Sequence, residues 1–298
     1  MDAQENIEKI LHSPTYRRAY EDIDFLNRDE ARPARLMLEL MKADLVLQEH
    51  GVRTTVVVFG GTRILPEPQA RARVAELEQL LRERPQQSEI QTALAVARRV
   101  LAKSPYYEQA RELGRLISST CQLGGPCDFV VMTGGGPGIM EGANRGAHDV
   151  GAKSVGLNVT LPREQLPNPF ISPELCFQFH YFAMRKMHFL LRAKALVAFP
   201  GGYGTLDELF ETLTLIQTQK MKPIPILLFG GAFWSQAIRF SFLADEGVID
   251  REDLDLFRLV ESAQQAWEAI VDFYRARGEW PMPPATTPLK GEGGGPKL

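Results

Sequence analysis

The chain has 298 residues, of which 44% are hydrophobic and 24% charged, and its formal net charge is −3. This composition is typical of a globular protein with a large core, and the small net charge argues against a general affinity for nucleic acid. The sequence has no apolar run of the roughly 18–20 residues that a membrane-spanning helix needs, and it begins without a signal-peptide pattern. Its three cysteines form no CxxC pair and no disulfide framework. We therefore expect a cytoplasmic protein, because thiols stay reduced there.

Composition also predicts how the chain is divided. Residues 1–50 are expected to form a helical extension that is interrupted at Pro33. Residues 66–104 are rich in Glu, Arg, Gln and Ala, and they predict a solvated helical insertion. Residues 281–298 are rich in Pro and Gly, which is typical of a disordered tail. One domain, residues 51–280, is then expected to carry the function.

Within this domain, apolar runs alternate with helical patterns. The expected strands are 53–61, 127–133, 153–161, 195–199 and 224–229. The expected helices are 106–123, 138–151, 205–219, 232–244 and 261–276, with 176–194 mostly helical after an extended start. Strands that alternate with helices favour a parallel sheet. We therefore predict an α/β protein with a Rossmann-like, doubly wound parallel sheet that carries helices on both faces.

Two of the strand-to-helix turns are unusually rich in glycine. The first reads GGGPG at residues 134–138 and the second reads GGYG at residues 201–204. Glycine exposes backbone amides at a helix N-terminus, where anions bind. We expect the two turns to lie at adjacent strand tips and to hold a phosphate and its neighbouring sugar. The first turn lacks the G-x-G-x-x-G spacing, and the absence of G-x-x-x-x-G-K-[ST] excludes a P-loop NTPase.

Both turns can also be interpreted without a ligand. The glycines could serve only to make tight turns. In the second, Thr205 and Glu208 have the spacing of a capping box, with Thr205 as N-cap and Glu208 at N3. The spacing alone does not distinguish a cap from a site.

A basic helix face precedes the second glycine turn. If residues 179–196 are helical, then Arg185, His188 and Arg192 lie on one face, on a helix that we expect to be largely buried. A buried arginine needs a carboxylate or a phosphate partner. His180 and His188 lack a third ligand at metal spacing, so no metal site is predicted.

These motifs resemble those of the Lonely Guy (LOG) family. The matching segments are PGGYGTLDE at 200–208, the Arg-Lys pair at 185–186, GGGPGIMEGANRGA at 134–147 and VFGGTR at 58–63. The 23-residue separation of Arg185 from Glu208 is the one expected for the family, and the resemblance extends over residues 52–275. The first turn departs from the family, because many members read CGSS where this chain reads GGTR.

The resemblance implies a hydrolase, a cytokinin riboside 5′-monophosphate phosphoribohydrolase similar to AMP nucleosidase. Such an enzyme cleaves the N-glycosidic bond of a nucleoside 5′-monophosphate, either AMP or cytokinin riboside 5′-monophosphate, and releases the free base and ribose 5-phosphate. The resemblance implies neither a cofactor nor a metal. It is closest to a longer bacterial branch, and implies a homo-oligomer, dimeric or larger, with its site near the subunit interface and with no nucleic-acid polymer or membrane as partner.

The expected roles follow from the chemistry of this reaction. Positive charge develops on the ribose ring in the transition state, and a nearby carboxylate stabilises it. Glu208 is expected to do so and to orient or deprotonate the attacking water, while Arg185 holds Glu208 ionised or contacts the nucleotide. The residues expected to bind the phosphate and the rest of the nucleotide are Gly135, Gly136, Gly201, Gly202, Gly204, Thr205, Lys186, Met184, Gly61 and Thr62.

The main alternative is a non-catalytic carrier of a nucleotide or of molybdenum cofactor on the same scaffold. A carrier would keep the glycine turns but would not need the Arg185–Glu208 combination. A dinucleotide redox enzyme is disfavoured by the glycine spacing. Relatives have also been labelled lysine decarboxylases, and we reject that label because no pyridoxal-lysine site is recognisable in the sequence.

Overall fold

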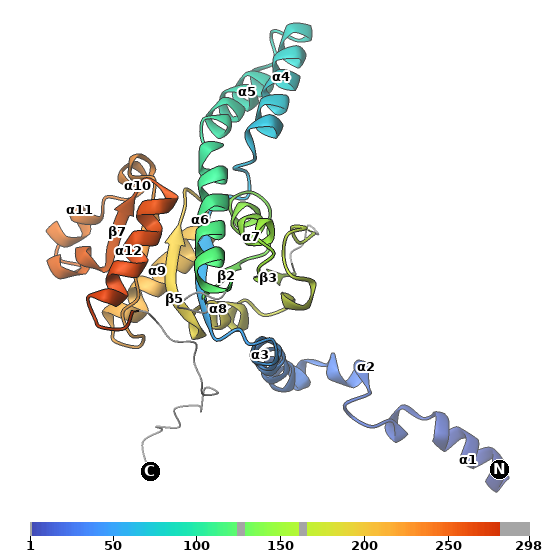
Figure 1. Ribbon diagram of the computed structural model, residues 1–298. Coiled ribbons are helices and arrows are strands. Elements are labelled where there is room, and N and C mark those ends of the chain that lie inside the picture. The colour runs from blue at the N-terminus through green and yellow to red at the C-terminus, as the bar shows by residue number, and fades with distance from the viewer. Residues whose placement is uncertain (1, 124–128, 161–165, 281–298) are drawn as a thin grey trace. The chain divides into compact units, whose positions relative to one another are not determined.

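The computed structural model describes residues 2–123, 129–160 and 166–280 (Figure 1). The chain divides into two compact units, residues 1–46 and residues 47–298. The tail expected at 281–298 lies outside the described residues.

The first unit consists of short helices. Its elements are α1 Ala3–His12, the 3-10 helix Pro14–Tyr16, α2 Ile23–Leu26, the 3-10 helix Asp29–Ala31 and most of α3 Arg32–Glu49. The expected interruption at Pro33 is wrong, because Pro33 stands in the first turn of α3, where the missing N–H costs no hydrogen bond. The breaks lie earlier in the chain, after α1 and after α2. Asp2 and Asp22 cap these two helices by accepting bonds from backbone amides.

The second unit is built on a seven-stranded sheet in which all pairings are parallel. The strands are β1 Thr54–Phe59, β2 Phe129–Thr133, β3 Ser154–Val159, β4 Cys176–Phe179, β5 Ala193–Ala198, β6 Ile226–Phe229 and β7 Phe257–Val260. Their order is β4-β3-β2-β1-β5-β6-β7. The predicted doubly wound α/β fold is confirmed. All six residues of β1 are buried, as the continuous β-branched run predicts for a central strand covered on both faces.

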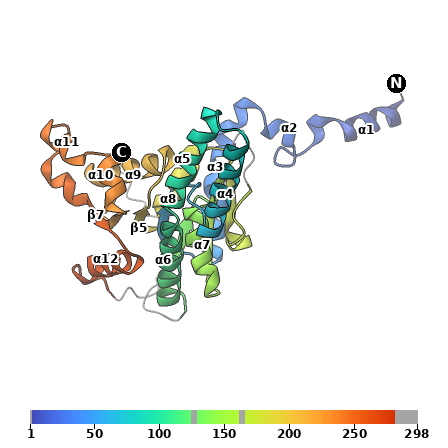
Figure 2. The ribbon, with the colours of Figure 1, turned by 90° about the horizontal axis from the view of Figure 1, so that it is seen from above.

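Helices cover both faces of this sheet. They are α6 Pro105–Cys121, α7 Ile139–Asp149, α8 Phe182–Leu191, α9 Tyr203–Gln217, α10 Gly231–Ala237, α11 Phe240–Asp245 and α12 Ala263–Arg275, with 3-10 helices at Pro173–Leu175 and Arg251–Leu256. The main core joins α6, α7 and α12 to one face of β1, β2 and β5, and α6 lies beside α7 in both views (Figures 1 and 2). Alternate strand residues point to the other face, where the Phe59 ring meets the Phe189 ring of α8 with 4.7 Å between centroids.

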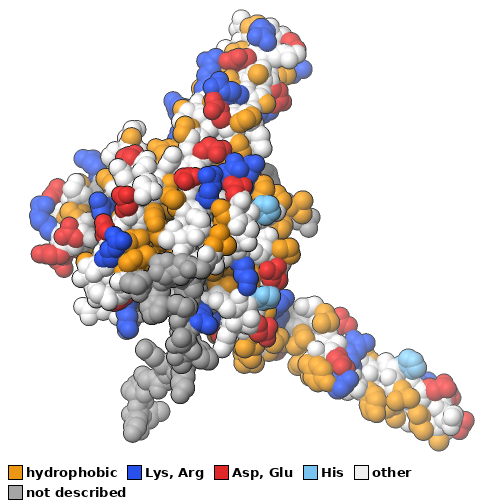
Figure 3. Space-filling model, viewed as in Figure 1, with side chains coloured by type: hydrophobic (Ala, Val, Ile, Leu, Met, Phe, Trp, Pro, Cys, Tyr) orange, Lys and Arg blue, Asp and Glu red, His pale blue; other side chains and the backbone are white. Residues whose placement is uncertain are grey.

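The predicted helical insertion forms a hairpin of α4 Glu67–Glu83 and α5 Ser88–Leu101. In Figure 1 it extends away from the sheet beyond α6, and Figure 3 shows positive and negative side chains mixed over its surface. Arg98 of α5 donates to Glu78 of α4 across the hairpin at 2.8 Å. Such an exposed pair contributes little to stability. The buried residues of the two helices are Ala70, Leu77 and Leu94.

Some local expectations are corrected by the fold. The helix expected at 232–244 is two helices, because Ile238 has an extended backbone (φ −145°, ψ 125°). Strand β7 was not predicted; it is short, pairs only with β6 and carries exposed residues. Cys121 is disulfide-bonded, contrary to the expectation of no disulfide. None of the helices in the described part of the chain has the length and hydropathy of a membrane span.

Candidate active site

A pocket of about 220 Å³ opens at the carboxyl ends of β1 and β5. From β1 the chain first builds β2, β3 and β4 on one side, and then β5, β6 and β7 on the other. The point where the strand order reverses is the usual ligand site of a doubly wound sheet. Two backbone bonds join the strand ends there, from Phe199 N to Phe59 O (2.8 Å) and from Gly61 N to Pro200 O (2.9 Å).

The structure brings some of the predicted site residues to this pocket and not others. Those that line it are Gly61, Thr62, Arg185, Gly202, Gly204, Thr205 and Glu208. Those that do not are Gly135, Gly136, Gly201, Lys186 and Met184. The pocket is also lined by Phe59, Gly60, Met140, Phe182 and Asp207. Phe182 could have been found because it lies one helical turn before Arg185, whereas no sequence signal marks Met140.

The glycine turn after β2 does not share a strand tip with the turn after β5. β1 lies between the two strands, so the expected adjacency is wrong. Gly135 and Gly136 are buried, and their carbonyl oxygens accept bonds from Asn168 Nδ2 at 3.2 and 3.1 Å. The turn reaches the pocket indirectly, since a Cβ on Gly134 would lie 2.5 Å from a guanidinium nitrogen of Arg185.

Helix α9 begins two residues earlier than the sequence predicts. Gly202 is its N-cap, no side chain caps the helix, and Thr205 N bonds to Gly202 O at 3.0 Å. The capping-box interpretation is therefore wrong, because Thr205 already lies inside the first turn and Glu208 lies one turn further on. Gly202, Gly204 and Thr205 line the pocket, so the positive end of the helix dipole lies at its edge.

Neither packing nor backbone conformation requires glycine at positions 202 and 204. A Cβ added at Gly202 or Gly204 would meet no atom within 4 Å, and neither residue has a positive φ. Gly60 differs, since its Cβ would lie 2.6 Å from Ile139. Both glycines line the pocket, so the bare backbone there is accessible to a ligand.

Arg185 lines the pocket, and its guanidinium group is held in place by a hydrogen bond and by two aromatic rings. Its Nε donates to Leu157 O at 2.7 Å, and the group lies over the rings of Phe182 and Phe189 at 5.8 and 5.1 Å. Among the described residues it forms no ion pair with a carboxylate. Burial lowers the pKa of Arg185, but an arginine remains charged in a protein. A half-buried cation without a carboxylate partner favours an anionic ligand.

Glu208 is 4% exposed, and its Oε2 is buried without a hydrogen-bond partner. The pKa of Glu208 is raised from 4.5 to about 7, mainly because the group is buried. The positive charge of Lys186 lowers the pKa, and the negative charge of Glu211 raises it further. The charge of Arg185 has a smaller effect. The expectation that Arg185 keeps Glu208 ionised is therefore corrected, because desolvation outweighs both cations. At neutral pH the carboxyl group can be either protonated or ionised, as acid–base chemistry needs.

Lys186 does not line the pocket, although its ion-pair partner Asp207 does. Its Nζ is 2.9 Å from Asp207 Oδ1 and 3.3 Å from Glu211 Oε2, the acids that flank Glu208 on α9. Burial lowers the pKa of Lys186, but these two carboxylates more than offset it, so the pKa is raised. The lysine thus joins α8 to α9 as a permanent cation and positions the helix that carries Glu208.

The expected basic face of α8 is not one surface. The helix ends at Leu191, and the buried Arg192 donates to Val52 O at 3.1 Å, away from the pocket. His188 is fully buried against the Phe179 ring. The helix is also less buried than expected, because Phe182, Met187 and Leu191 are between 43% and 52% exposed. The described residues contain no cluster of side chains suited to a metal ion.

Known proteins have sequences or folds similar to those of this chain. A family model described as "Possible lysine decarboxylase" matches residues 140–270. A cytokinin riboside 5′-monophosphate phosphoribohydrolase of Oryza sativa subsp. japonica is 32% identical over 174 residues, 57% of this chain and 66% of the rice protein. A protein of the same name from Arabidopsis thaliana is 30% identical over 175 residues, 57% of this chain and 77% of its own. The X-ray structure of TM1055 is 21% identical and covers 73% of this chain and 98% of its own, with a TM-score of 0.44.

Proposed function

Because this chain belongs to the LOG family of phosphoribohydrolases, we propose that it hydrolyses the N-glycosidic bond of a nucleoside 5′-monophosphate, with AMP or cytokinin riboside 5′-monophosphate as substrate. The observation that carries the proposal is one pocket lined by Glu208, Arg185 and the N-terminus of α9. Among the described residues, Glu208 Oε2 has no hydrogen-bond partner and Arg185 forms no ion pair. These are the groups that a cationic sugar ring and a phosphate need.

The chemistry assigns a role to each group. The amides around Gly202 and Gly204, with the hydroxyl of Thr205, anchor the 5′-phosphate, and Arg185 contacts the same anion. Anchoring at a distance from the reacting bond makes the reaction effectively intramolecular. Ionised Glu208 stabilises the positive ribose ring and accepts a proton from the attacking water. The C1′–N bond breaks, its electron pair leaves with the base, and water oxygen bonds to C1′ to give ribose 5-phosphate.

The description of the matching family model as a lysine decarboxylase receives no support from the pocket. A pyridoxal-binding lysine needs a neutral amine that reaches the ligand. Lys186 is the lysine whose charge acts on Glu208, but it does not line the pocket, and its raised pKa keeps it protonated. We therefore favour glycosidic hydrolysis.

We also propose that the protein is a homo-oligomer with the site near a subunit interface. Large apolar side chains are exposed on the two helices that carry the site, namely Phe182 and Met187 on α8 and Tyr203 and Phe210 on α9. Tyr203, at 91% exposure, directly follows the glycine N-cap. Burial of these side chains against a second copy would remove apolar surface from water and would also exclude water from the pocket.

The substrate proposal is tested by incubating the protein with AMP and, separately, with adenosine. AMP is expected to yield free adenine and ribose 5-phosphate, measured by chromatography, with kcat/KM at least about 100-fold above that for adenosine, because only AMP uses the phosphate anchor. Equal cleavage of both would contradict the anchor. Binding of AMP without release of adenine would favour the carrier alternative.

Gly204→Ala tests the anchor without disturbing the fold. The new methyl group enters open pocket space, so KM for AMP is expected to rise about tenfold, roughly 1.4 kcal/mol. The free energy of unfolding should stay the same or rise by up to about 1 kcal/mol, since alanine favours the helix.

Gly60→Ala is the matched contrast. Its methyl group would collide with Ile139, so urea denaturation should show clear destabilisation. If Gly204→Ala left KM unchanged, the N-terminus of α9 would not be the phosphate site.

A further inference from the structure

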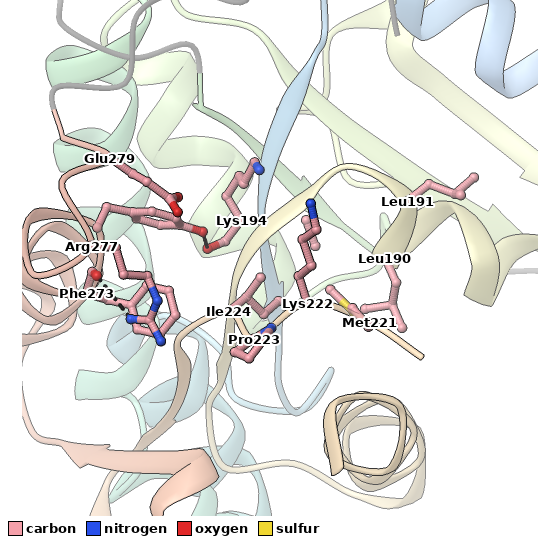
Figure 4. Close-up of a pocket in the computed structure, with 12 residues that line it drawn as sticks. Leu190, Leu191, Lys194, Met221, Lys222, Pro223, Ile224, Phe273, Arg277 and Glu279 are labelled. Atoms are coloured by element: carbon pink, nitrogen blue, oxygen red, sulfur yellow. Dashed lines mark hydrogen bonds between the residues drawn. The ribbon is translucent and has the colours of Figure 1, made fainter. Parts of the chain in front are cut away.

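A second and larger pocket, of about 350 Å³, lies at the opposite edge of the sheet. It is formed by the end of α8, the start of β5, the segment that leads into β6 and the end of α12 (Figure 4). All strands run parallel, so their amino ends lie at this edge and their carboxyl ends at the first pocket. The two pockets share no lining residue. The volume falls in the range of small-molecule sites.

Cations dominate the polar part of this second pocket. Lys194, Lys222 and Arg277 line it, and Glu279 is the one acidic residue of the lining. Among the described residues, none of the three cations forms an ion pair. In Figure 4 the side chains of Lys194 and Lys222 extend in the same direction, while Arg277 lies over Phe273. The formal charge of the lining is therefore +2.

Two contacts hold the charged wall in place. Arg277 donates to Phe273 O at 3.2 Å, and its guanidinium carbon lies 3.6 Å from the centre of the Phe273 ring. Tyr274 donates its hydroxyl hydrogen to Lys194 O at 2.6 Å, which fixes the backbone from which Lys194 extends. Stacking leaves the remaining N–H groups of Arg277 available to a ligand.

The rest of the lining is apolar. Leu190, Leu191, Met221 and Ile224 form this wall, and Figure 4 shows Leu190, Leu191 and Met221 together on the side away from Arg277. Leu191 is 52% exposed although it lines the pocket, so a ligand that covered it would gain from burying apolar surface. The pocket therefore has a charged side and an apolar side. Such a pocket favours a ligand that has a charged group at one end and an apolar body at the other.

We propose that this second pocket binds a phosphorylated small molecule, a phosphate monoester whose apolar body lies on the leucine wall and whose phosphate lies among Lys194, Lys222 and Arg277. A phosphate monoester carries nearly two negative charges at neutral pH, which matches the charge of the lining, and its three oxygens can accept bonds from several cations. A carboxylate ligand would carry one negative charge, which matches the formal charge of +2 of the lining less well. The proposal is independent of the proposed enzymatic function.

Isothermal titration calorimetry of the full chain with phenyl phosphate, at low ionic strength, tests this assignment. The variant Lys222→Glu/Arg277→Glu reverses two of the three cations, and the dissociation constant of the second-pocket site is expected to rise at least tenfold. The matched control Lys220→Glu/Arg275→Glu makes the same charge change at neighbouring exposed positions outside the lining, and it should bind within twofold of wild type. Both double variants keep the first pocket intact, so their difference isolates the second.

A single variant and a second probe test the proposal further. Lys222→Gln changes one exposed side chain and is expected to weaken binding about threefold even if the double variant is destabilised. Inorganic phosphate should bind at least fivefold more weakly than phenyl phosphate, because it lacks the apolar body. Equal binding of phenyl phosphate by the two double variants would overturn the site. Equal affinity for the two probes would overturn the assignment of an organic monoester.

Discussion

Glu208→Gln is expected to lower kcat for base release by at least about 100-fold while nucleotide binding stays within a few-fold of wild type. Glutamine has the shape of the carboxyl group but can neither stabilise the cationic ring by charge nor take a proton from water. The measurement is single-turnover release of adenine from AMP, together with the dissociation constant of the nucleotide.

Loss of the fold would not explain such a result. Glu208 is buried with one oxygen that lacks a hydrogen-bond partner, so removal of its charge should stabilise the protein at neutral pH and above. Glu211→Gln is the control, because Glu211 lies one turn further along α9 and does not line the pocket. Its kcat should stay within about threefold of wild type. Wild-type turnover by Glu208→Gln would remove Glu208 from the mechanism.

The second large effect is the dependence of activity on pH. Glu208 has a pKa of about 7, and the proposed mechanism uses its ionised form. The value of kcat/KM is therefore expected to fall about tenfold for each pH unit below 7 and to level off above it. The Glu211 carboxylate raises the pKa of Glu208, so Glu211→Gln should move the midpoint to lower pH. A profile that is flat from pH 5 to 8 would contradict this assignment.

The same group should link stability to pH. The folded pKa is raised from 4.5 to about 7, so the protonated form favours folding, and this contribution is complete below about pH 4.5. It is lost as the pH rises through 7, and the free energy of unfolding of the wild type should fall by at most about 3 kcal/mol relative to Glu208→Gln. Urea denaturation of both proteins at pH 4.5, 6 and 8 measures this difference.

Several features of this protein could be predicted because they depend on short stretches of sequence. The β-branched run 53–61 predicted a buried strand, and the alternation of strands and helices predicted a doubly wound sheet with helices on both faces. The segment PGGYGTLDE predicted the turn that the structure places at a pocket, together with Glu208. The extended start of 176–194 was predicted as well, and it is β4.

The sequence did not reveal which segments become neighbours. β1 lies between β2 and β5, so Gly135 and Gly136, which were predicted as site residues, do not line the pocket, whereas the predicted Gly61 does. β7 was missed because an edge strand with exposed residues lacks the continuous apolar run of a central strand. The start of α9 was misplaced because Thr205 and Glu208 fit a capping box equally well.

By itself, the sequence determined the alternation of elements, the bare backbone of the second glycine turn and the identity of the acid that follows it. Only the tertiary structure decided the raised pKa of Glu208, the unpaired charge of Arg185 and the gathering of Lys194, Lys222 and Arg277 around a second pocket. The periodicity of hydrophobic residues indicates which side chains within one segment are buried. The pKa of a carboxyl group and the charge of a pocket depend on atoms that are distant in the chain, and those become neighbours only when the sheet has formed.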